Sequence, residues 1–375
     1  MTGTGPVGVG VIGTGMISKT YLENLTSFPD VRVVAVGDLD TELAASRAEA
    51  HGVPHSGGPE VVLAHPEVEI VVNLTTPAAH VPVSSAAIAA GKHVWSEKPV
   101  GINRDEAQRL LAAADAAGLR VGVAPDTMLG PGVQTARRAI ARGDIGTPLA
   151  AQTVMQYIGP DTFHPGPEFL FAKGAGPLFD MGPYYLSALI NVFGPIAQVA
   201  AVGTRGRSTR TIQLGDRAGT EFPVEVPTLV QAIAAFRSGG VAQSTFSFDS
   251  HLRRVGVVEI TGTEGTLSIP DPNLFTGEVR VTRAPAAGSA STETVWEAVP
   301  SVGVAAERGL GVLDMARAIR SGTGHVATGE LGYHVLDAMV SIDESITTGQ
   351  FVDLDSTVAE IPMVAEGWDP FAATL

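Results

Sequence analysis

The 375-residue sequence contains no cysteine. Without thiols the chain can form no disulfide bond, and it has neither a cysteine nucleophile nor a cysteine-based zinc or iron–sulfur site. Its aspartate, glutamate and histidine residues also lack the spacing of a metal-binding motif, so we expect no metal. Any proton chemistry must therefore depend on lysine, tyrosine, aspartate or histidine side chains.

Basic residues are scarce as well. The chain has 24 lysines and arginines against 39 aspartates and glutamates, which gives a formal charge of −15. Nucleic acids and anionic membranes bind basic patches, so we expect neither as a partner. Only four of the basic residues are lysines: Lys19, Lys92, Lys98 and Lys173.

Long uninterrupted apolar stretches are missing too. The nearest candidate, Leu186–Val202, contains Asn191 and Gly194-Pro195, so we expect no transmembrane helix. The first residues lack the positively charged region of a signal peptide. These features predict a cytoplasmic protein.

The composition nevertheless favours a well-packed chain. Hydrophobic residues make up 45% of the sequence and charged residues only 17%, so a large core is easily formed. Single cores stop growing at about 250–300 residues, so the length predicts two domains.

The N-terminal residues follow the order expected of a dinucleotide-binding unit. An apolar run at 7–12 leads into Gly13-Thr14-Gly15, a helix-like segment at 19–25 and a second apolar run at 31–36. Asp38 follows this second run. Strand, glycine turn, helix, strand and acid is the order of the βαβ unit that binds dinucleotides. A simple tight turn remains the alternative for the glycines alone.

The chemistry of this unit predicts which dinucleotide it binds. Glycines let the backbone approach a pyrophosphate at the start of a helix. The carboxylate of Asp38 would bind the adenosine ribose hydroxyls and repel a 2′-phosphate, and no lysine or arginine directly follows it. We therefore expect NAD in preference to NADP. Ser18 at the third motif position is a small departure from the usual glycine or alanine.

Strands and helices continue to alternate up to about residue 124. Further strands are predicted at 69–74, 93–96 and 119–124, and helices at 41–51, 79–90 and 104–117. This alternation predicts a doubly wound parallel sheet, which binds ligands at the carboxyl ends of its strands. Thr75-Thr76-Pro77 and Glu97-Lys98-Pro99 each follow such a strand end.

The pattern changes after Pro125. Strands dominate, with a hairpin turn at 238–240, a long polar connection at 204–226 and a loop at 284–292. The strands are predicted at 149–157, 228–236, 241–248 and 255–260, and the helices at 134–142, 305–320 and 331–347. We expect the last two helices to pack behind this second sheet. The predicted domains are a dinucleotide-binding domain at 1–124 and a substrate-binding and oligomerisation domain at 125–375.

Four segments, in this order and spacing, resemble the Gfo/Idh/MocA family of NAD(P)-dependent oxidoreductases. They are GVIGTGMIS, NLTTPAAH, AGKHVWSEKP and GAGPLFDMGPYY. The resemblance implies an N-terminal Rossmann domain and a C-terminal α/β domain with a large, mostly antiparallel open sheet. In this family that sheet forms the substrate wall and often the subunit interface, so we expect a homodimer or homotetramer.

The resemblance also assigns residues to the cofactor and to catalysis. Four residues would meet the pyrophosphate: Gly13, Gly15, Met16 and Ile17. Asp38 would meet the ribose. Four more match the segment along the cofactor: Thr75, Thr76, Pro77 and His80. Glu97 and Lys98 match the signature whose lysine lies near the nicotinamide and the substrate hydroxyl, and whose Lys-Pro bond is often cis. For His80 and Glu97 a purely structural role remains open, and Lys98 could be a solvated surface lysine.

The second motif departs from the usual family pattern. Four residues after Asp180 the family usually has histidine, whereas this chain has Tyr184. Tyrosine at this position resembles the branch that includes glucose–fructose oxidoreductase. A nearby ammonium such as that of Lys98 would favour the phenolate, so Tyr184 could act as the base. Tyr185 is the alternative, and is expected to be a packing residue.

Two further residues are candidates for the substrate site. Asp180 and Tyr184 share one face if their segment is helical, so Asp180 could orient the substrate hydroxyl. Asp180 could also be the N-cap of that helix. His164 lies in a loop rich in proline and glycine that could cover the substrate, although a plain surface loop fits equally well.

Together these features predict an NAD-dependent dehydrogenase or reductase. Its substrate would be a secondary alcohol, or the corresponding ketone, of a sugar, glycoside or polyol. One alternative is an enzyme that retains NAD and uses it for redox-assisted glycoside cleavage or sugar–sugar oxidoreduction. Another is a non-catalytic NAD sensor.

Overall fold

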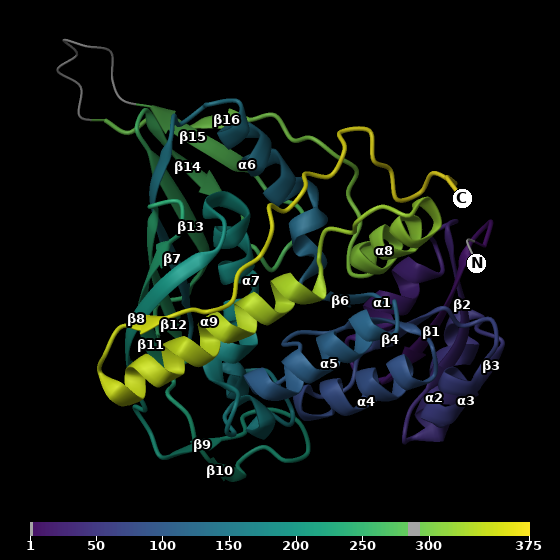
Figure 1. Cartoon of the computed structure of the whole chain (residues 1–375). Coiled ribbons are helices and arrows are strands. Elements are labelled where there is room, and N and C mark those ends of the chain that lie inside the picture. The colour runs from purple at the N-terminus through teal and green to yellow at the C-terminus, as the bar shows by residue number, and fades with distance from the viewer. Residues whose placement is uncertain (1–2, 284–292) are drawn as a thin grey trace. The chain divides into compact units, whose positions relative to one another are not determined.

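The computed structural model describes residues 3–283 and 293–375, so the loop expected at 284–292 lies outside the described residues (Figure 1). The chain divides into two compact units. The first contains the described residues up to Gly130, together with Gly303–Leu336 and Pro362–Leu375, and the second contains the remainder. Two late segments thus join the first unit, unlike the linear division at residue 124 expected from the sequence. A separation of cofactor and substrate functions between these parts stays a prediction.

The first unit is built on a parallel sheet of six strands in the order β3-β2-β1-β4-β5-β6. The strands are β1 (Val7–Ile12), β2 (Val31–Gly37), β3 (His55–Gly57), β4 (Ile70–Asn73), β5 (His93–Ser96) and β6 (Val121–Val123). All residues of β1 and β4 are buried, as expected of parallel strands covered on both faces. The strand order reverses between β1 and β4, and doubly wound sheets bind ligands at the carboxyl ends beside this switch point. The predicted Rossmann fold is confirmed.

Helices connect these strands. They are α1 (Ser18–Leu25), α2 (Thr41–His51), α3 (Pro59–Ala64), α4 (Pro77–Ala89) and α5 (Arg104–Ala116), and a 3₁₀ helix, η1 (Asp126–Leu129), follows β6. Asp40 caps α2 by accepting a hydrogen bond from the Leu43 N–H, and Asn103 caps α5 by accepting one from Glu106. In Figure 1, α4 and α5 lie side by side, in agreement with their contacts.

One helix expected behind the second sheet belongs to the first unit instead. Helix α8 (Leu310–Ser321) contacts β4, β6 and η1, and it begins five residues later than predicted. Gly309 precedes it with φ +113°, a conformation that favours glycine. A Cβ added at Gly311 would lie 1.9 Å from the Trp95 ring, so this glycine allows α8 to approach β5 closely.

The second unit contains a nine-stranded sheet in the order β16-β15-β14-β13-β7-β12-β11-β8-β17. Its strands are β7 (Pro148–Gln156), β8 (Ile196–Thr204), β11 (Leu229–Phe236), β12 (Val241–Ser247), β13 (Arg254–Gly262), β14 (Gly265–Ile269), β15 (Val279–Arg283), β16 (Glu297–Val299) and β17 (Val352–Asp353). Among the described strands of this sheet, β7 and β12 pair in parallel and the other pairs are antiparallel. The predicted mostly antiparallel sheet is confirmed. So is the hairpin turn at 238–240, where Gly239 has φ +95°.

Helices cover one face of this sheet. They are α6 (Pro131–Ala141) and α7 (Gly176–Phe193), and α7 contacts β7, β11 and β12. Helix α9 (Gly329–Thr348) begins in the first unit and ends in the second, where the Ser345 hydroxyl accepts a hydrogen bond from the Ala201 N–H of β8. The opposite face of β8, β11 and β12 carries exposed side chains, among them Val202 and Ile233.

The segment 204–226 is more ordered than the predicted polar connection. It contains a small hairpin of β9 (Thr209–Thr211) and β10 (Glu221–Pro223). The reason is Arg210 of β9, whose side chain is buried and pairs with Asp161 at 2.8 Å and with Asp249 at 2.5 Å. A buried guanidinium needs such partners, and they fix the hairpin to the loops that follow β7 and β12.

Candidate active site

The turn after β1 has the geometry of a phosphate-binding loop. Gly13 has φ +101°, and a Cβ there would lie 2.7 Å from the carbonyl of Leu74, so glycine is required. Gly15 is exposed, and an added Cβ would meet no atom within 4 Å, so the space beside it is open. Met16, which is 72% exposed, and Ile17 complete the turn before α1 begins. The open space and the N-terminal N–H groups of α1 fit a pyrophosphate.

Asp38, at the end of β2, is held against this turn. One of its carboxylate oxygens accepts hydrogen bonds from the backbone N–H of Thr14 at 2.6 Å and from the Thr14 hydroxyl at 2.8 Å. The other oxygen accepts one from the Asp40 N–H at 3.0 Å. Burial raises the pKa of Asp38, but these hydrogen bonds outweigh burial and leave its pKa below the ordinary value. The carboxylate is therefore an anion at the position expected for the ribose.

An arginine lies near Asp38 that the sequence reasoning missed. The Arg47 Nε donates a hydrogen bond to the carbonyl of Thr14 at 3.4 Å. The residues directly after Asp38 are not basic, as noted from the sequence, but α2 brings Arg47 back to the turn. In the sequence, Arg47 could have been noticed as a basic residue two turns into the helix that follows Asp38. Its position beside Thr14 matters for the choice between NAD and NADP.

The segment after β4 is fixed by buried hydrogen bonds. The Asn73 side-chain amide donates to the carbonyl of His80 at 2.9 Å and to the Ser84 hydroxyl at 3.0 Å. Its oxygen accepts a hydrogen bond from the Thr75 hydroxyl at 2.6 Å. Thr76 then precedes α4, and Pro77 occupies the first turn of that helix, where proline is well tolerated. Thr75, Thr76 and Pro77 thus form a rigid edge at the carboxyl end of β4.

The His80 ring lies behind this edge and is almost completely buried. Its Nδ1 lies 2.6 Å from the carbonyl oxygen of Pro99, and its Nε2 lies 3.0 Å from the carbonyl oxygen of Thr75. Burial lowers the pKa of His80, against the opposing effect of these carbonyl groups. Both ring nitrogens therefore face the backbone, and the ring joins the segment after β4 to the segment after β5. Direct contact of His80 with the cofactor stays a prediction.

Glu97, Lys98 and Pro99 follow β5, and the Lys98-Pro99 peptide bond is cis, as the family resemblance implied. The Glu97 carboxyl group accepts hydrogen bonds from the Tyr21 hydroxyl at 2.9 Å and from the Lys98 backbone N–H at 3.0 Å. Lys98 is half-buried, which differs from the fully solvated surface lysine considered from the sequence. Tyr21, a residue of α1, was not singled out in the sequence.

Asp126 is a second buried acid that the sequence reasoning missed. Its Oδ2 accepts hydrogen bonds from the N–H groups of Gly309 at 2.8 Å and Gly311 at 3.2 Å, at the start of α8. Within the described residues its Oδ1 is buried and has no hydrogen-bond partner. Burial raises the pKa of Asp126 to about 6, although the nearby Arg308 opposes this. Asp126 follows β6 at the carboxyl edge of the parallel sheet, and this position could have marked it as a candidate from the sequence.

Asp180 and Tyr184 lie in the second unit, within α7. The helix begins at Gly176, so the suggestion that Asp180 is its N-cap is wrong; glycine and proline, tolerated in a first turn, start the helix earlier. Because both residues are helical and four positions apart, their side chains share one face. Asp180 is half-buried and Tyr184 is buried.

The two adjacent tyrosines differ in their surroundings. The Tyr185 hydroxyl accepts a hydrogen bond from the Gly256 N–H at 2.8 Å, and its ring packs edge-on against Phe246 at 5.8 Å. Tyr185 is fully buried, and burial raises its pKa. Tyr185 is therefore a packing residue, as expected from the sequence. The catalytic role of Tyr184 stays a prediction.

Aromatic side chains line the loops that follow β7. Burial, and then the negative charge of Asp180, raise the pKa of Tyr157, so its hydroxyl group lies within electrostatic range of that carboxyl group. The Tyr157 ring contacts Phe248 at 5.3 Å and Phe163 at 6.1 Å. His164 packs against Phe169, and its Nδ1 accepts a hydrogen bond from the backbone of its own loop. Its contact with substrate stays a prediction.

The structure thus brings together the predicted cofactor residues of the first unit and, separately, Asp180 and Tyr184 in the second. In residues 3–283 and 293–375 no three His, Asp or Glu side chains are grouped so that they could hold a metal ion. None of the helices in that part of the chain is long and apolar enough to cross a membrane.

The fold and the first unit's turn define a dinucleotide-dependent oxidoreductase. A family model described as an oxidoreductase family with an NAD-binding Rossmann fold matches residues 7–124. The model of the GFO/IDH/MocA C-terminal domain matches residues 133–268. The chain therefore combines the N-terminal NAD-binding domain and the C-terminal domain of the GFO/IDH/MocA oxidoreductases, and its cofactor is NAD.

Individual relatives agree with this assignment. The chain is 28% identical to trans-1,2-dihydrobenzene-1,2-diol dehydrogenase of Bos taurus over 268 residues. This aligned region covers 70% of this chain and 74% of that protein. The chain is 27% identical over 261 residues to 1,5-anhydro-D-fructose reductase of Ensifer adhaerens, and this region covers 69% of this chain and 74% of the reductase. The structure of levoglucosan dehydrogenase in complex with NADH and L-sorbose shares the fold, with a TM-score of 0.80 and 22% sequence identity. The superposition covers 94% of this chain and 100% of the dehydrogenase chain. The structural likeness shows the fold, and the NAD-binding family model together with the two relatives supports NAD-dependent dehydrogenase activity.

Proposed function

We propose that this protein transfers a hydride between NAD and a secondary alcohol, or the corresponding ketone, of a sugar, glycoside or polyol. The observation that carries the proposal is the first unit, in which part-buried hydrogen bonds fix the anionic Asp38 to the turn after β1 and hold the backbone of the half-buried Lys98. The names of the relatives add a substrate class, because they act on a cyclic diol and an anhydrosugar.

Cofactor binding is assigned to residues at the carboxyl edge of the first sheet. Backbone groups of the turn after β1 would hold the pyrophosphate: Gly13, Gly15, Met16 and Ile17. Asp38 would accept hydrogen bonds from the ribose, and the edge formed by Thr75, Thr76 and Pro77 would lie along the cofactor. His80 and Glu97 support this edge and the lysine that follows β5.

Three side chains carry the proposed chemistry. Bound NAD supplies the hydride acceptor. Tyr184 takes up the hydroxyl proton, Lys98 supplies the positive charge that favours the phenolate, and Asp180 orients the hydroxyl through a hydrogen bond. A tyrosine four residues after Asp180, where the family usually has histidine, supports the proposal that the protein belongs to the tyrosine-containing branch. His164 could contribute a substrate contact from its loop.

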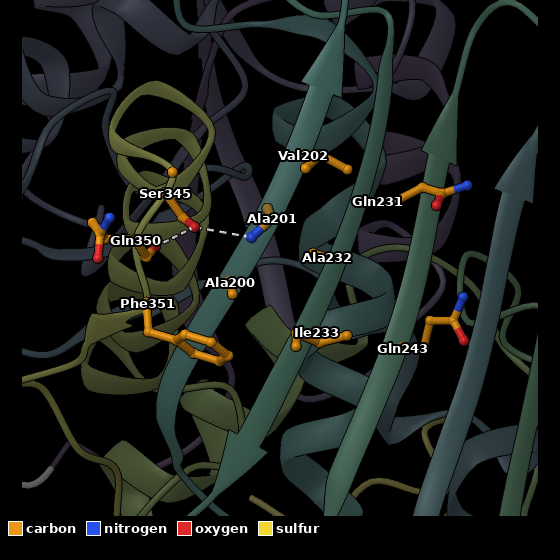
Figure 2. A pocket seen from close by; sticks show the side chains of 11 residues that line it. Ala200, Ala201, Val202, Gln231, Ala232, Ile233, Gln243, Ser345, Gln350 and Phe351 are labelled. Atoms are coloured by element: carbon orange, nitrogen blue, oxygen red, sulfur yellow. Dashed lines mark hydrogen bonds between the residues drawn. The ribbon is translucent and has the colours of Figure 1, made fainter.

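A homo-oligomer formed through the outer face of the second sheet is also proposed, as is a cytoplasmic location. The outward side chains of β8, β11 and β12 are uncharged and include Val202, Ile233 and Val241, which are 69%, 48% and 50% exposed. A cavity of about 370 Å³ hollows this face (Figure 2). Phe351 lies at its edge, with its ring reaching toward Ile233. Exposed apolar patches of this kind mark association surfaces.

The oligomer is tested by light scattering of the native protein and of Ile233→Asp. A charge on this face would be buried without a partner in the assembly, so the variant should dissociate to monomers. Leu39→Asp is the control, because Leu39 is 92% exposed in the first unit. A native protein that is monomeric, or an Ile233→Asp protein of unchanged mass, would exclude this interface.

The activity is tested by following NADH formation with a panel of sugars, glycosides and polyols. NAD-dependent turnover of at least one compound, with little turnover when NADP replaces NAD, is expected. A protein that binds NAD but oxidises no member of the panel, and reduces none of the corresponding ketones, would contradict the proposal.

A further inference from the structure

A chain of three hydrogen bonds, of which the first two are buried, connects α1 to the lysine that follows β5. The Trp95 indole N–H donates to the Tyr21 hydroxyl oxygen at 3.3 Å, and the Tyr21 hydroxyl donates to one oxygen of Glu97 at 2.9 Å. The other oxygen of Glu97 accepts the backbone N–H of Lys98 at 3.0 Å. Trp95 and Tyr21 are fully buried and Glu97 is 8% exposed, so water does not compete for these groups. Linked hydrogen bonds in such surroundings strengthen one another.

Tyr21 has a fixed direction in this chain. Burial, followed by the charges of Glu97 and Asp126, raises its pKa well above the ordinary value for tyrosine. The hydroxyl therefore keeps its proton and acts as the donor to Glu97. Tyr21 is also a residue of α1, the helix that begins at the pyrophosphate turn. The hydrogen bonds thus connect Tyr21, on the cofactor-binding helix, to Lys98 through Glu97.

The opposite side of the lysine segment is held as well. The Pro99 carbonyl faces the His80 ring at 2.6 Å, so the Lys98-Pro99 pair is fixed at its N–H end by Glu97 and at its carbonyl end by His80. These two contacts restrain the backbone on both sides of Lys98, from which its side chain projects.

We propose that Tyr21 is a positioning residue for Lys98, which it orients through Glu97. The proposal rests on the proposed function in one respect, namely that Lys98 is a catalytic residue. Through this chain, the helix that receives the pyrophosphate also sets the place of the lysine that meets the substrate hydroxyl. A tyrosine that only filled space in the core would need its ring but not its hydroxyl.

The first test separates the hydroxyl from the ring. Tyr21→Phe keeps the buried ring and removes the donor to Glu97, so kcat should fall about tenfold while the KM for NAD changes less than twofold. Tyr333→Phe is the matched control, because it removes a hydroxyl that accepts a hydrogen bond from Gln108 at 2.7 Å elsewhere in the first unit. A Tyr21→Phe enzyme with unchanged kcat would overturn the proposal.

The second test shows whether Tyr21 acts through Glu97. The Tyr21 hydroxyl and the Lys98 N–H donate to different oxygens of Glu97, and Glu97→Gln replaces one of these oxygens by an NH2 group, which cannot accept a hydrogen bond. If the two residues form one path, the double variant Tyr21→Phe/Glu97→Gln should lose no more kcat than the worse single variant. Losses that multiply would show that the two side chains act independently. Glu97→Gln also keeps the proposal testable if Tyr21→Phe does not fold.

The third test does not depend on turnover. Because the chain has only four lysines, selectively labelled lysine should give four resolvable side-chain NMR signals, and Lys98→Arg identifies the signal of Lys98. In Tyr21→Phe the Lys98 signal should move and those of the other three lysines should not. An unmoved Lys98 signal would overturn the positioning role. A moved signal in a protein that oxidises no sugar would instead count against the proposed function alone.

Discussion

Thr14 binds Asp38 twice, through its backbone N–H at 2.6 Å and its hydroxyl at 2.8 Å, so the glycine turn and this carboxylate are held together. The turn cannot move without moving the carboxylate. Arg47 approaches the same residue from the other side by donating to the Thr14 carbonyl. The turn after β1 therefore combines an anion held by hydrogen bonds with a nearby cation.

This arrangement predicts how cofactor preference can be changed. Asp38→Ala should raise kcat/KM for NADP about tenfold or more, because the repulsion of a 2′-phosphate disappears while the positive charge of Arg47 remains. Initial rates with NAD and NADP measure the change. In an Arg47→Ala background the same substitution should raise NADP use much less. An NADP preference that does not respond to Asp38→Ala would contradict the assignment of this residue to the ribose.

Asp126 predicts a pH dependence of stability. Its pKa is near 3.8 in the unfolded chain and about 6 in the folded protein, mainly because of burial. Between these values the folded state binds more protons than the unfolded state, so its contribution to stability falls as the pH rises from about 4 to 6. The loss amounts to about 3 kcal/mol for a shift of this size. Urea unfolding at pH 4 and pH 7, followed by tryptophan fluorescence, measures it.

Asp126→Asn is the variant that isolates this effect. The amide cannot ionise but can still accept the N–H groups of Gly309 and Gly311, so the variant should lose less stability than the native protein over this interval. Asp314, whose pKa burial also raises to about 6, contributes with the same sign in both proteins. Equal pH dependence of native protein and variant would show that Asp126 titrates normally.

The two neighbouring tyrosines should respond differently to loss of the hydroxyl. Tyr184→Phe should lower kcat about 10²- to 10³-fold, because the proposed base is removed. Tyr185→Phe should keep kcat but unfold about 1 kcal/mol more easily, because the Gly256 N–H loses its acceptor. Steady-state kinetics and denaturant unfolding of both variants test this. Equal losses of kcat would refute the choice of Tyr184.

The local motifs of the first unit were readable because each depends on neighbouring residues. Glycine at 13 follows from backbone geometry, and the positions of Thr75 and Lys98 just after strand ends follow from the pattern of buried strands. A parallel sheet exposes its carboxyl ends on one edge, so these residues could be expected together.

Contacts between distant segments could not be read in this way. The hydrogen bond between Tyr21 and Glu97 joins positions 76 apart, and Asp126 meets the start of α8 more than 180 residues later. Arg47 was missed because its place depends on the direction of α2, and the hairpin at 209–223 because it depends on the buried Arg210. Such pairings are decided by tertiary packing and by the need of buried polar groups for partners.

The most direct test of the account is the effect of Lys98→Met on turnover and on NAD binding, measured on the same preparation. Methionine keeps an unbranched side chain but removes the ammonium group that the mechanism requires. We expect kcat for the best sugar or polyol to fall at least a hundredfold while the Kd for NAD changes less than threefold. A variant that binds NAD and retains the kcat of the native enzyme would contradict it.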